Sequence, residues 1–393
     1  MTDLYHQTRQ CRGCRHPSSE LRELIRMNPM PVAGPLNSSQ EIALRIPKIP
    51  LTLLQCPHCG LIQTQEVLNP HFQIDKTPFP TSQFSGLVSH HQEFANLLHE
   101  RYELNNSVHF IEMGSNDGIL LNALPRSWVK LGIDSESIGQ FPENPTIQRI
   151  AEPLTKALVD KFQLDDWAHV VCLNNSIANI DDARHYFETA SRLLISGGEF
   201  WIEEPSFDLL LADEQWDLLN HSQPNFWTLS SLQSCLDPLG LEYVESFQPA
   251  DNINIQRHVF RKGSPVLSES HFDGISPHLL RLKGAYEKRF ESPILKRLME
   301  ARRMGKRIAA MSASRRTQVY LNQVQILPIE FVIDEVPQRQ NHWIPGRGLQ
   351  VVPSSHLQLY PIDILLVSHA SEIEGYRTRH PQFKGDWIAR FGR

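Results

Sequence analysis

Two Cys-x-x-Cys pairs constrain the N-terminal part of this chain more than any other feature. The first pair is Cys11 and Cys14, and the second is Cys56 and Cys59. A glycine in or beside each pair allows a tight turn that aims two thiolates at one ion. Four thiolates complete the tetrahedral shell of a structural zinc ion and leave no open position for a substrate. We therefore expect one structural zinc ion on these four residues, with free buried thiols or a redox dithiol as the alternatives.

Composition limits the partners and the compartment. The net charge of the 393 residues is −6, and no block of lysine and arginine interleaved with aromatic residues occurs. A small-molecule partner is therefore predicted rather than a nucleic acid. No signal peptide is seen, and no apolar run approaches the roughly 18 residues that span a bilayer, so no membrane partner is predicted. Six cysteines, four of them in the two pairs, favour a reducing, cytoplasmic location without disulfide bonds.

The pattern along the chain predicts an α/β protein in three parts. These are a zinc-binding module (1–75), a Rossmann-like domain (76–278), and a connecting helix with a second α/β domain (279–393). The strands predicted from apolar runs are 49–55 in the first part, 108–113, 128–133, 168–173 and 199–202 in the second, and 307–312, 329–333 and 362–367 in the third. Alternation of such strands with helical stretches is typical of a doubly wound sheet.

Two further segments are predicted from local pattern. Residues 29–35, which contain three prolines, are expected to form an irregular loop between the cysteine pairs. Residues 279–307 are rich in arginine and lysine, with Leu280, Leu295 and Leu298 on another face. We interpret this segment as one solvated connecting helix rather than a basic binding site.

A glycine-containing turn after the strand at 108–113 predicts a cofactor site. Glycine there lets a ligand approach the backbone, and the helix that follows offers free amides. The turn lacks the three-glycine cradle of dinucleotide enzymes, which favours a ligand without a diphosphate. An aspartate about twenty residues later can accept hydrogen bonds from both ribose hydroxyls. Together these features suit S-adenosylmethionine, and the predicted cofactor residues are Glu112, Gly114, Ser115, Asn116, Asp117, Gly118, Asp134, Asn174 and Asn175. Asn175 has an alternative role as a helix cap.

The order of these residues resembles a known family, the zinc-containing sugar C-methyltransferases that alkylate carbon 3 of nucleotide-linked keto-deoxysugars. The resemblance covers nearly the whole chain. It is carried by the four cysteines, by 31–34 (Pro-Val-Ala-Gly), by 112–121, by Asn174 and Asn175, by Ile202, Glu203 and Pro205, and by Pro345, Gly346 and 351–353. The resemblance implies three domains, bound zinc and S-adenosylmethionine as the methyl donor.

The sequence departs from that family where the acceptor chemistry would lie. A Tyr-His-Glu-His run supplies the family's base, whereas residues 220–223 here read Asn-His-Ser-Gln. Asn179 stands where the family has a histidine, residues 253–255 replace a Gly-Gly-Ser turn, and residues 312–316 (Ser-Ala-Ser-Arg-Arg) replace a glycine-rich turn. An amide cannot accept a proton near neutral pH, so Gln223 cannot act as the base. The cofactor half of the pattern is retained and the sugar half is not.

We therefore expect an S-adenosylmethionine-dependent methyltransferase that acts on a different small-molecule intermediate of natural-product biosynthesis. In this hypothesis Asn220, His221, Gln223 and Asn225 orient the acceptor, and His221 or Glu204 takes its proton. His221 has an alternative role in packing or in hydrogen bonding to the backbone. Two other functions stay open: an enzyme that consumes the aminocarboxypropyl arm of the cofactor, and a non-catalytic homologue that binds the cofactor or a partner.

Overall fold

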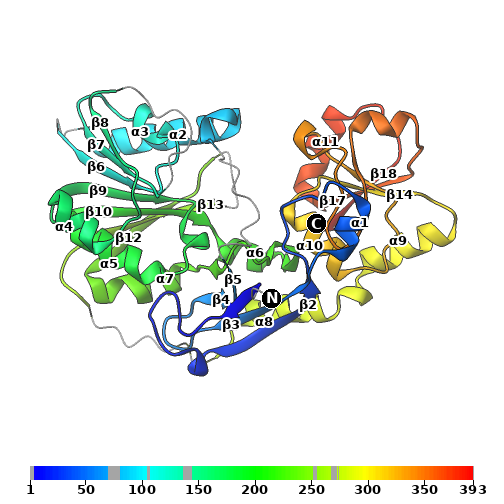
Figure 1. The fold of residues 1–393 in the computed structure, drawn as a ribbon, viewed down its shortest axis with the longest axis horizontal. Helices are drawn as coiled ribbons and strands as arrows, with labels where there is room; N and C mark the ends of the chain where they lie inside the picture. The colour runs from blue at the N-terminus through cyan, green and yellow to red at the C-terminus, as the bar shows by residue number, and fades with distance from the viewer. Residues whose placement is uncertain are drawn as a thin grey trace.

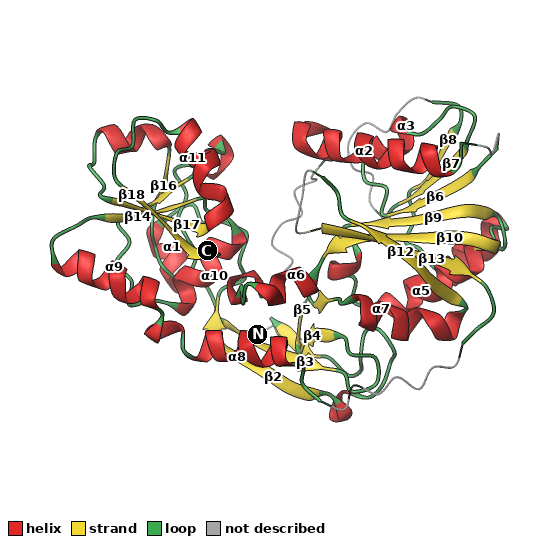
Figure 2. Ribbon diagram, turned by 180° about the vertical axis from the view of Figure 1, so that it is seen from behind, coloured by secondary structure: helices red, strands yellow, loops and turns green. Residues whose placement is uncertain are grey.

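The computed structural model describes residues 4–69, 80–103, 107–135, 144–250, 255–266, 272 and 274–392. The predicted α/β class is confirmed. Two α/β units stand on either side of an N-terminal β-sheet (Figure 1), and the view from behind shows helices on both faces of the larger unit's sheet (Figure 2). No helix within the described ranges is both long enough and apolar enough to cross a bilayer.

The larger unit is built on a seven-stranded sheet with the order β12-β13-β10-β9-β6-β7-β8. Its strands are β6 (His109–Met113), β7 (Val129–Ile133), β8 (Ile147–Ile150), β9 (Ala168–Asn174), β10 (Leu194–Pro205), β12 (Leu241–Phe247) and β13 (Ile255–Lys262). The strands β6 to β10 run parallel, whereas β12 and β13 pair antiparallel at one edge. Helices cover both faces of parallel strands, which explains why their sequences are nearly continuous apolar runs. The predictions for β6, β7 and β9 are each within one residue, and β10 is longer than predicted.

Helices pack on both faces of this sheet. They are α2 (Ser85–Arg101), α3 (Ile119–Ala123), α4 (Lys156–Phe162), α5 (Ala183–Leu193) and α7 (Leu229–Leu236). The short helix α6 (Phe207–Ala212) instead buries Phe207 in the apolar cluster of the N-terminal sheet and the C-terminal unit. Phe94 of α2 and Leu120 of α3 bury against one face, together with Trp201 of β10. Phe187 of α5 and Leu232 of α7 bury against the other face. The carboxyl ends of β6 and β9 therefore lie in the middle of a three-layer unit.

The N-terminal sheet has the order β11-β4-β3-β2. It contains β2 (Arg22–Met30), β3 (Ile49–Gln55), β4 (Ile62–Thr64) and β11 (Asn225–Phe226), and the pair β1 (Tyr5–Gln7) and β5 (Glu66–Leu68) lies beside it. The helix α1 (Gln40–Arg45) lies against the C-terminal unit, where Gln40 Nε2 donates to Gly348 O at 3.0 Å (Figure 1). The prediction of β3 is confirmed. The loop predicted at 29–35 is wrong for its first two residues, because β2 continues to Met30, which pairs with Ile49. The last strand, β11, comes from the chain of the larger unit and pairs with β4.

The C-terminal unit has a parallel sheet with the order β16-β15-β14-β17-β18. Its strands are β14 (Ile308–Met311), β15 (Val332–Ile333), β16 (Val351–Val352), β17 (Ile364–His369) and β18 (Asp386–Phe391), and its helices are α8 (Pro277–Glu287), α9 (Pro293–Arg303), α10 (Arg315–Gln323) and α11 (Ile373–Arg379). Each of the three predicted strands overlaps a strand of the structure, but β15 keeps only two of its five predicted residues and β17 lies two residues later than predicted.

The single helix predicted at 279–307 is wrong. The segment forms α8 and α9, and between them Ser292 has ψ 131°, outside the helical region. Pro293 causes this break, because a proline lacks the N–H that a continuing helix needs and disfavours the helical region for the residue before it. Leu295 and Leu298 are buried as predicted, but Leu280 is 52% exposed.

The N-terminal sheet shares its hydrophobic cores with both α/β units. Leu51 and Leu53 of β3 belong to one buried cluster with Ile308 and Leu366 of the C-terminal unit. Cys11 and its partner cysteines belong to a second cluster, which includes Phe187 of the larger unit. Two separate apolar clusters therefore join the N-terminal part of the chain to the two α/β units.

Candidate functional site

The four predicted zinc ligands lie together. Their sulfur atoms are all within 4.8 Å of one another, and Sγ–Sγ distances of 3.5 Å join Cys11 to Cys59 and Cys14 to Cys56. All four are free thiols. Zinc–sulfur bonds of about 2.3 Å in a tetrahedron require sulfur atoms about 3.8 Å apart, close to this spacing. His16 Nδ1, 3.3 Å from Cys14 Sγ, matches the outer-shell hydrogen bonds that orient metal ligands. The cluster therefore fits a structural zinc ion.

The turn after β6 brings backbone close to the end of β9. Gly114 donates its N–H to Ile133 O at 2.8 Å and has a φ of +78°. This left-handed conformation is costly for any residue with a Cβ atom. A Cβ atom at this position would also lie 2.9 Å from Ser176 Oγ. Only glycine therefore satisfies both the conformation and the close approach.

Two buried carboxyl groups flank the turn. Glu112 accepts a hydrogen bond from Asn174 Nδ2 at 3.1 Å, and burial raises the pKa of Glu112 to about 8. Asp117 accepts a hydrogen bond from the Ser82 N–H at 2.9 Å. Each carboxyl group keeps one oxygen, Glu112 Oε2 and Asp117 Oδ1, with no hydrogen-bond partner among the described residues. Buried oxygens of this kind are normally satisfied, which indicates that a ligand belongs beside them.

A cavity of about 450 Å³ lies over this turn. Seven of the nine predicted cofactor residues line it: Glu112, Gly114, Ser115, Asn116, Asp117, Asn174 and Asn175. Gly118 is the N-cap residue of α3 and has a φ of +75°. Asp134 does not line the cavity, and its Oδ2 accepts a hydrogen bond from the Asn116 N–H at 2.9 Å. In the structure Asp134 thus stabilises the turn through the Asn116 N–H without lining the cavity.

Asn175 is fixed by the neighbouring strand. Its φ is +48°, and its backbone N–H donates to Glu203 O at 2.8 Å. Its side chain also donates to the Glu203 carboxylate. The alternative role as a helix cap is not observed, because the short 3-10 turn that follows begins after Ser176 and has no side-chain cap. Asn175 is therefore positioned at the edge of the cofactor cavity by two contacts to Glu203.

A second cavity of about 260 Å³ adjoins the first. Its lining comes from the N-terminal sheet, the larger unit and the C-terminal unit: Val32, Pro35, Glu66, Val67, Leu68, Asn179, Asp181, His221, Ser222, Pro224 and Arg315. Asn179 lines both cavities. Three positions at which the sequence departs from the family, Asn179, Ser222 and Arg315, therefore meet in one place. We call the two spaces the cofactor cavity and the acceptor cavity.

His221 lines the acceptor cavity and contacts the N-terminal sheet. Its Nε2 lies 3.2 Å from Ile49 O and 3.1 Å from Pro50 O. Both oxygens are carbonyl acceptors, so Nε2 carries the proton and Nδ1 carries the lone pair. Nδ1 has no hydrogen-bond partner in the described part of the chain. Burial lowers the pKa of His221 to about 4, so the ring is neutral at physiological pH.

The other candidate acceptor residues are held by the protein itself. The Asn220 side chain donates to Leu218 O at 2.9 Å and accepts from the Ser222 N–H at 3.0 Å. Asn225 donates to the backbone oxygens of residues 177 and 180, which fixes β11. Gln223 is half-buried and lines neither cavity. Residues 253 and 254 of the altered turn lie outside the described residues.

Glu204 is buried away from both cavities. Its side chain is 1% exposed, and its Oε1 lies 3.7 Å from His258 Nε2. Burial raises the pKa of Glu204 well above its ordinary value, and lowers the pKa of His258 to about 4. The two side chains come from the neighbouring strands β10 and β13, and neither lines the acceptor cavity.

The sequence reasoning did not select His91, which lines the cofactor cavity from α2. Its Nδ1 has no hydrogen-bond partner among the described residues, and burial lowers its pKa. No spacing or motif distinguished His91 from its neighbour His90. Its place became visible only when α2 packed over the carboxyl edge of the sheet.

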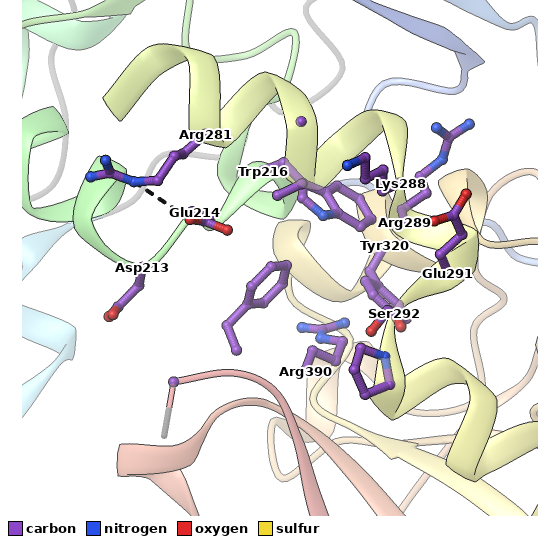
Figure 3. A pocket seen from close by; sticks show the side chains of 15 residues that line it. Asp213, Glu214, Trp216, Arg281, Lys288, Arg289, Glu291, Ser292, Tyr320 and Arg390 are labelled. Carbon is purple, nitrogen blue, oxygen red and sulfur yellow. Dashed lines mark ion pairs between the residues drawn. The ribbon is translucent and has the colours of Figure 1, made fainter. Parts of the chain in front are cut away.

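A third cavity, of about 760 Å³, lies between α8 and the end of β18 (Figure 3). Its lining carries charges of both signs, and Arg281 pairs with Glu214 at 3.7 Å. It shares no lining residue with the other two cavities, and no predicted site residue lines it. The candidate site is therefore the pair of cavities that meet at Asn179.

Two solved structures resemble parts of the chain. One is a chain from the complex between the Haloferax volcanii Trm112 methyltransferase activator and a methyltransferase. It is 14% identical to this chain, the match covers 48% of this chain and 96% of that chain, and the TM-score is 0.37. The other is N-methyltransferase NodS from Bradyrhizobium japonicum WM9 in complex with S-adenosyl-l-homocysteine. It is 12% identical to this chain, the match covers 49% of this chain and 94% of that chain, and the TM-score is 0.34. These TM-scores are too low to establish a common fold.

Sequence comparison is more specific. C-methyltransferase NovU of Streptomyces niveus is 23% identical over 248 residues, which are 62% of this chain and 59% of NovU. The chain thus matches less than two thirds of that relative's length. Residues 285–390 match the family model described as the C-methyltransferase C-terminal domain. Residues 285–390 thus match a C-methyltransferase C-terminal domain, and the similarity to NovU supports the resemblance to sugar C-methyltransferases that the sequence carries.

Proposed function

We propose that this protein is a methyltransferase that uses S-adenosylmethionine and acts on a small-molecule acceptor. One observation carries the proposal: the cofactor cavity and the acceptor cavity share Asn179, so ligands in the two spaces would be neighbours. Such an arrangement supplies the proximity on which much of the rate of group transfer depends. In this proposal residues 1–75 hold zinc, 76–278 hold the cofactor, and 279–393 close the acceptor cavity. The boundary at 75 lies outside the described residues.

The residues of the cofactor cavity fit S-adenosylmethionine. Its sulfonium and ammonium groups are cationic, and the cavity presents Glu112 and Asp117, each with an oxygen without a partner among the described residues. Gly114 leaves room where a side chain would stand. When bound, the cofactor supplies an activated methyl group. We assign Glu112 and Asp117 to the cationic groups, and we keep Asp134 as the residue that supports the turn and meets the ribose.

The acceptor cavity supports a small acceptor other than the family's sugar nucleotide. Its volume of about 260 Å³ is below the roughly 300–1,000 Å³ of sites that enclose drug-sized ligands. The residues that replace the family's base surround it or lie next to it. We therefore propose that the protein does not methylate carbon 3 of a nucleotide-linked 4-keto sugar.

His221 is the proposed proton acceptor. The carbonyl oxygens of Ile49 and Pro50 fix its tautomer, so Nδ1 keeps its lone pair. A neutral imidazole in a fixed orientation is the usual form of a general base. Its low pKa suits an acceptor that is already electron-rich and needs orientation more than deprotonation. None of the comparisons favours the aminocarboxypropyl reaction or a non-catalytic role.

The test is mass spectrometry of products formed from isotope-labelled S-adenosylmethionine, alone and with candidate acceptors. We expect a labelled methyl group on a small acceptor and no product from a 4-keto-2,6-dideoxy sugar nucleotide. Calorimetry with S-adenosylhomocysteine measures cofactor binding separately. Turnover of the sugar nucleotide near one per second, within the usual enzyme range, would show that the parent activity survives. Absence of S-adenosylhomocysteine binding would refute the methyltransferase proposal.

A further inference from the structure

The acidic residues of the acceptor cavity have partners within the protein, whereas one of its basic residues does not within the described ranges. Glu66 is buried, and its two carboxyl oxygens accept hydrogen bonds from the Thr52 N–H at 2.7 Å and the Thr52 hydroxyl at 2.9 Å. Asp181 pairs with Arg12 Nε at 2.7 Å. Both carboxylates of the lining are therefore occupied by other parts of the protein.

Arg315 is the exception. It is exposed, and no hydrogen bond or ion pair joins its side chain to another residue in the described part of the chain. Within the described ranges its guanidinium is therefore a cation of the acceptor cavity with no counter-charge paired to it. A planar guanidinium binds carboxylate and phosphate oxygens through two parallel hydrogen bonds, so this is the chemistry that the free side chain offers.

The position of Arg315 is defined by the loop opposite. A Cβ atom on Gly34 would lie 3.1 Å from Arg315 Nε, so the guanidinium stem runs over this glycine. Gly34 has a φ of +130° and is fixed by Gln318, which accepts its N–H at 3.0 Å and donates to its carbonyl oxygen at 3.1 Å. Helix α10 therefore carries both Arg315 and Gln318, the residue that fixes the loop beneath the Arg315 side chain.

We propose that the acceptor carries a carboxylate or phosphate group and that Arg315 of the C-terminal unit binds it. The inference rests on the proposed function and names the class of its substrate. The anionic group would lie at the C-terminal side of the acceptor cavity, and the methyl-accepting atom would lie toward Asn179, which borders the cofactor cavity. Arg315 stands in the segment 312–316, where the sequence departs from the glycine-rich turn of the family that it resembles.

The test compares an acid with its uncharged amide. The full-length protein is saturated with S-adenosylhomocysteine, and 4-hydroxybenzoate, 4-hydroxybenzamide and inorganic phosphate are titrated into it by calorimetry. We expect the acid to bind about tenfold more tightly than the amide, as hydrogen bonds to charged groups typically allow. Phosphate that competes with the acid would show a general oxyanion site, and phosphate without effect would restrict the site to carboxylates.

Variants decide whether Arg315 is responsible. Arg315→Gln should remove the preference for the acid, and Arg315→Lys should retain part of it, because charge remains and the planar fork is lost. Arg45→Gln, on the exposed surface of α1, is the matched control and should bind as the wild type does. Equal binding of acid and amide by the wild type, or an unchanged preference in Arg315→Gln, would overturn the inference while cofactor binding still stands. Loss of S-adenosylhomocysteine binding by the wild type would overturn the proposed function and this inference together.

Discussion

Replacement of Gly114 by alanine should damage both stability and cofactor binding, and the structure separates the two causes. The φ of Gly114 is +78°. A left-handed alanine costs roughly 1–2 kcal/mol, of which roughly 0.4–1 kcal/mol returns because alanine restricts the unfolded chain. The new Cβ atom would also stand 2.9 Å from Ser176 Oγ, but 3.7 Å, an ordinary contact distance, from Ser176 Cβ. Gly114→Ala should therefore cost about 2–3 kcal/mol once this overpacking is added.

Ser176→Ala provides the partner for a double-mutant cycle. It removes the crowding oxygen and one hydrogen bond from Ser176 Oγ to Asn174 O, which should cost about 1 kcal/mol. In the double variant the penalty for Gly114→Ala should fall to about 1 kcal/mol, a coupling of about 1–2 kcal/mol.

The assays are urea unfolding for stability and calorimetry for S-adenosylhomocysteine. Ser176→Ala alone should bind the ligand, whereas both variants with alanine at 114 should bind at least about tenfold more weakly, because the methyl group occupies space above the turn. Additive stability changes would refute the close approach of Gly114 to Ser176. Wild-type affinity in the double variant would refute the placement of the cofactor over this turn.

Four further outcomes are expected. Purified protein should hold one zinc ion, Cys11→Ala should lose it, and less than about half an equivalent by elemental analysis would count against the site. The pKa of Glu112 in the folded protein is raised to about 8, so the stability that it contributes is complete below the unfolded pKa of about 4.3 and is lost as pH rises through 8. Urea unfolding at several pH values should show this fall in the free energy of unfolding, and Glu112→Gln should reduce it. Asp134→Ala should weaken S-adenosylhomocysteine binding about ten- to a hundredfold in calorimetry, and Asp134→Asn less, because an amide oxygen can still accept the hydrogen bond from the turn. His221→Gln should slow methyl transfer about a hundredfold or more without changing that binding, and an unchanged rate would leave His221 a packing role.

Apolar runs in the sequence predicted those parts of the fold that are determined by residues close together in the sequence. The parallel strands β6, β7 and β9 are buried on both faces, so their sequences alone identify them. The break between α8 and α9 was also predictable from one residue, Pro293. The charge pattern of residues 279–307 suggested one continuous helix instead. The pairing of β11 with β4 was not predictable in this way, because two residues carry no periodicity.

The candidate site shows the same division. The turn from Glu112 to Gly118 is continuous in sequence, and all seven of the predicted cofactor residues that line the cavity fall either in this turn or in the pair Asn174 and Asn175. The acceptor cavity joins Asn179, His221 and Arg315 with the loop at Val32, and only tertiary packing relates these distant segments. Sequence comparison with the family marked several of the positions as altered, but it did not show that they face one another.

The completion of the N-terminal sheet by β11 has a consequence for synthesis of the chain. All four thiolates have been made once residue 59 is added, so an ion can close this segment into a loop early. The edge of β4, however, has no partner until residues 225 and 226 emerge, and the apolar side of β3 waits for the C-terminal unit. An unpaired edge and uncovered apolar surface are the features that make a nascent chain prone to aggregation. Chaperone dependence should therefore be greatest while the ribosome is translating the middle of the message.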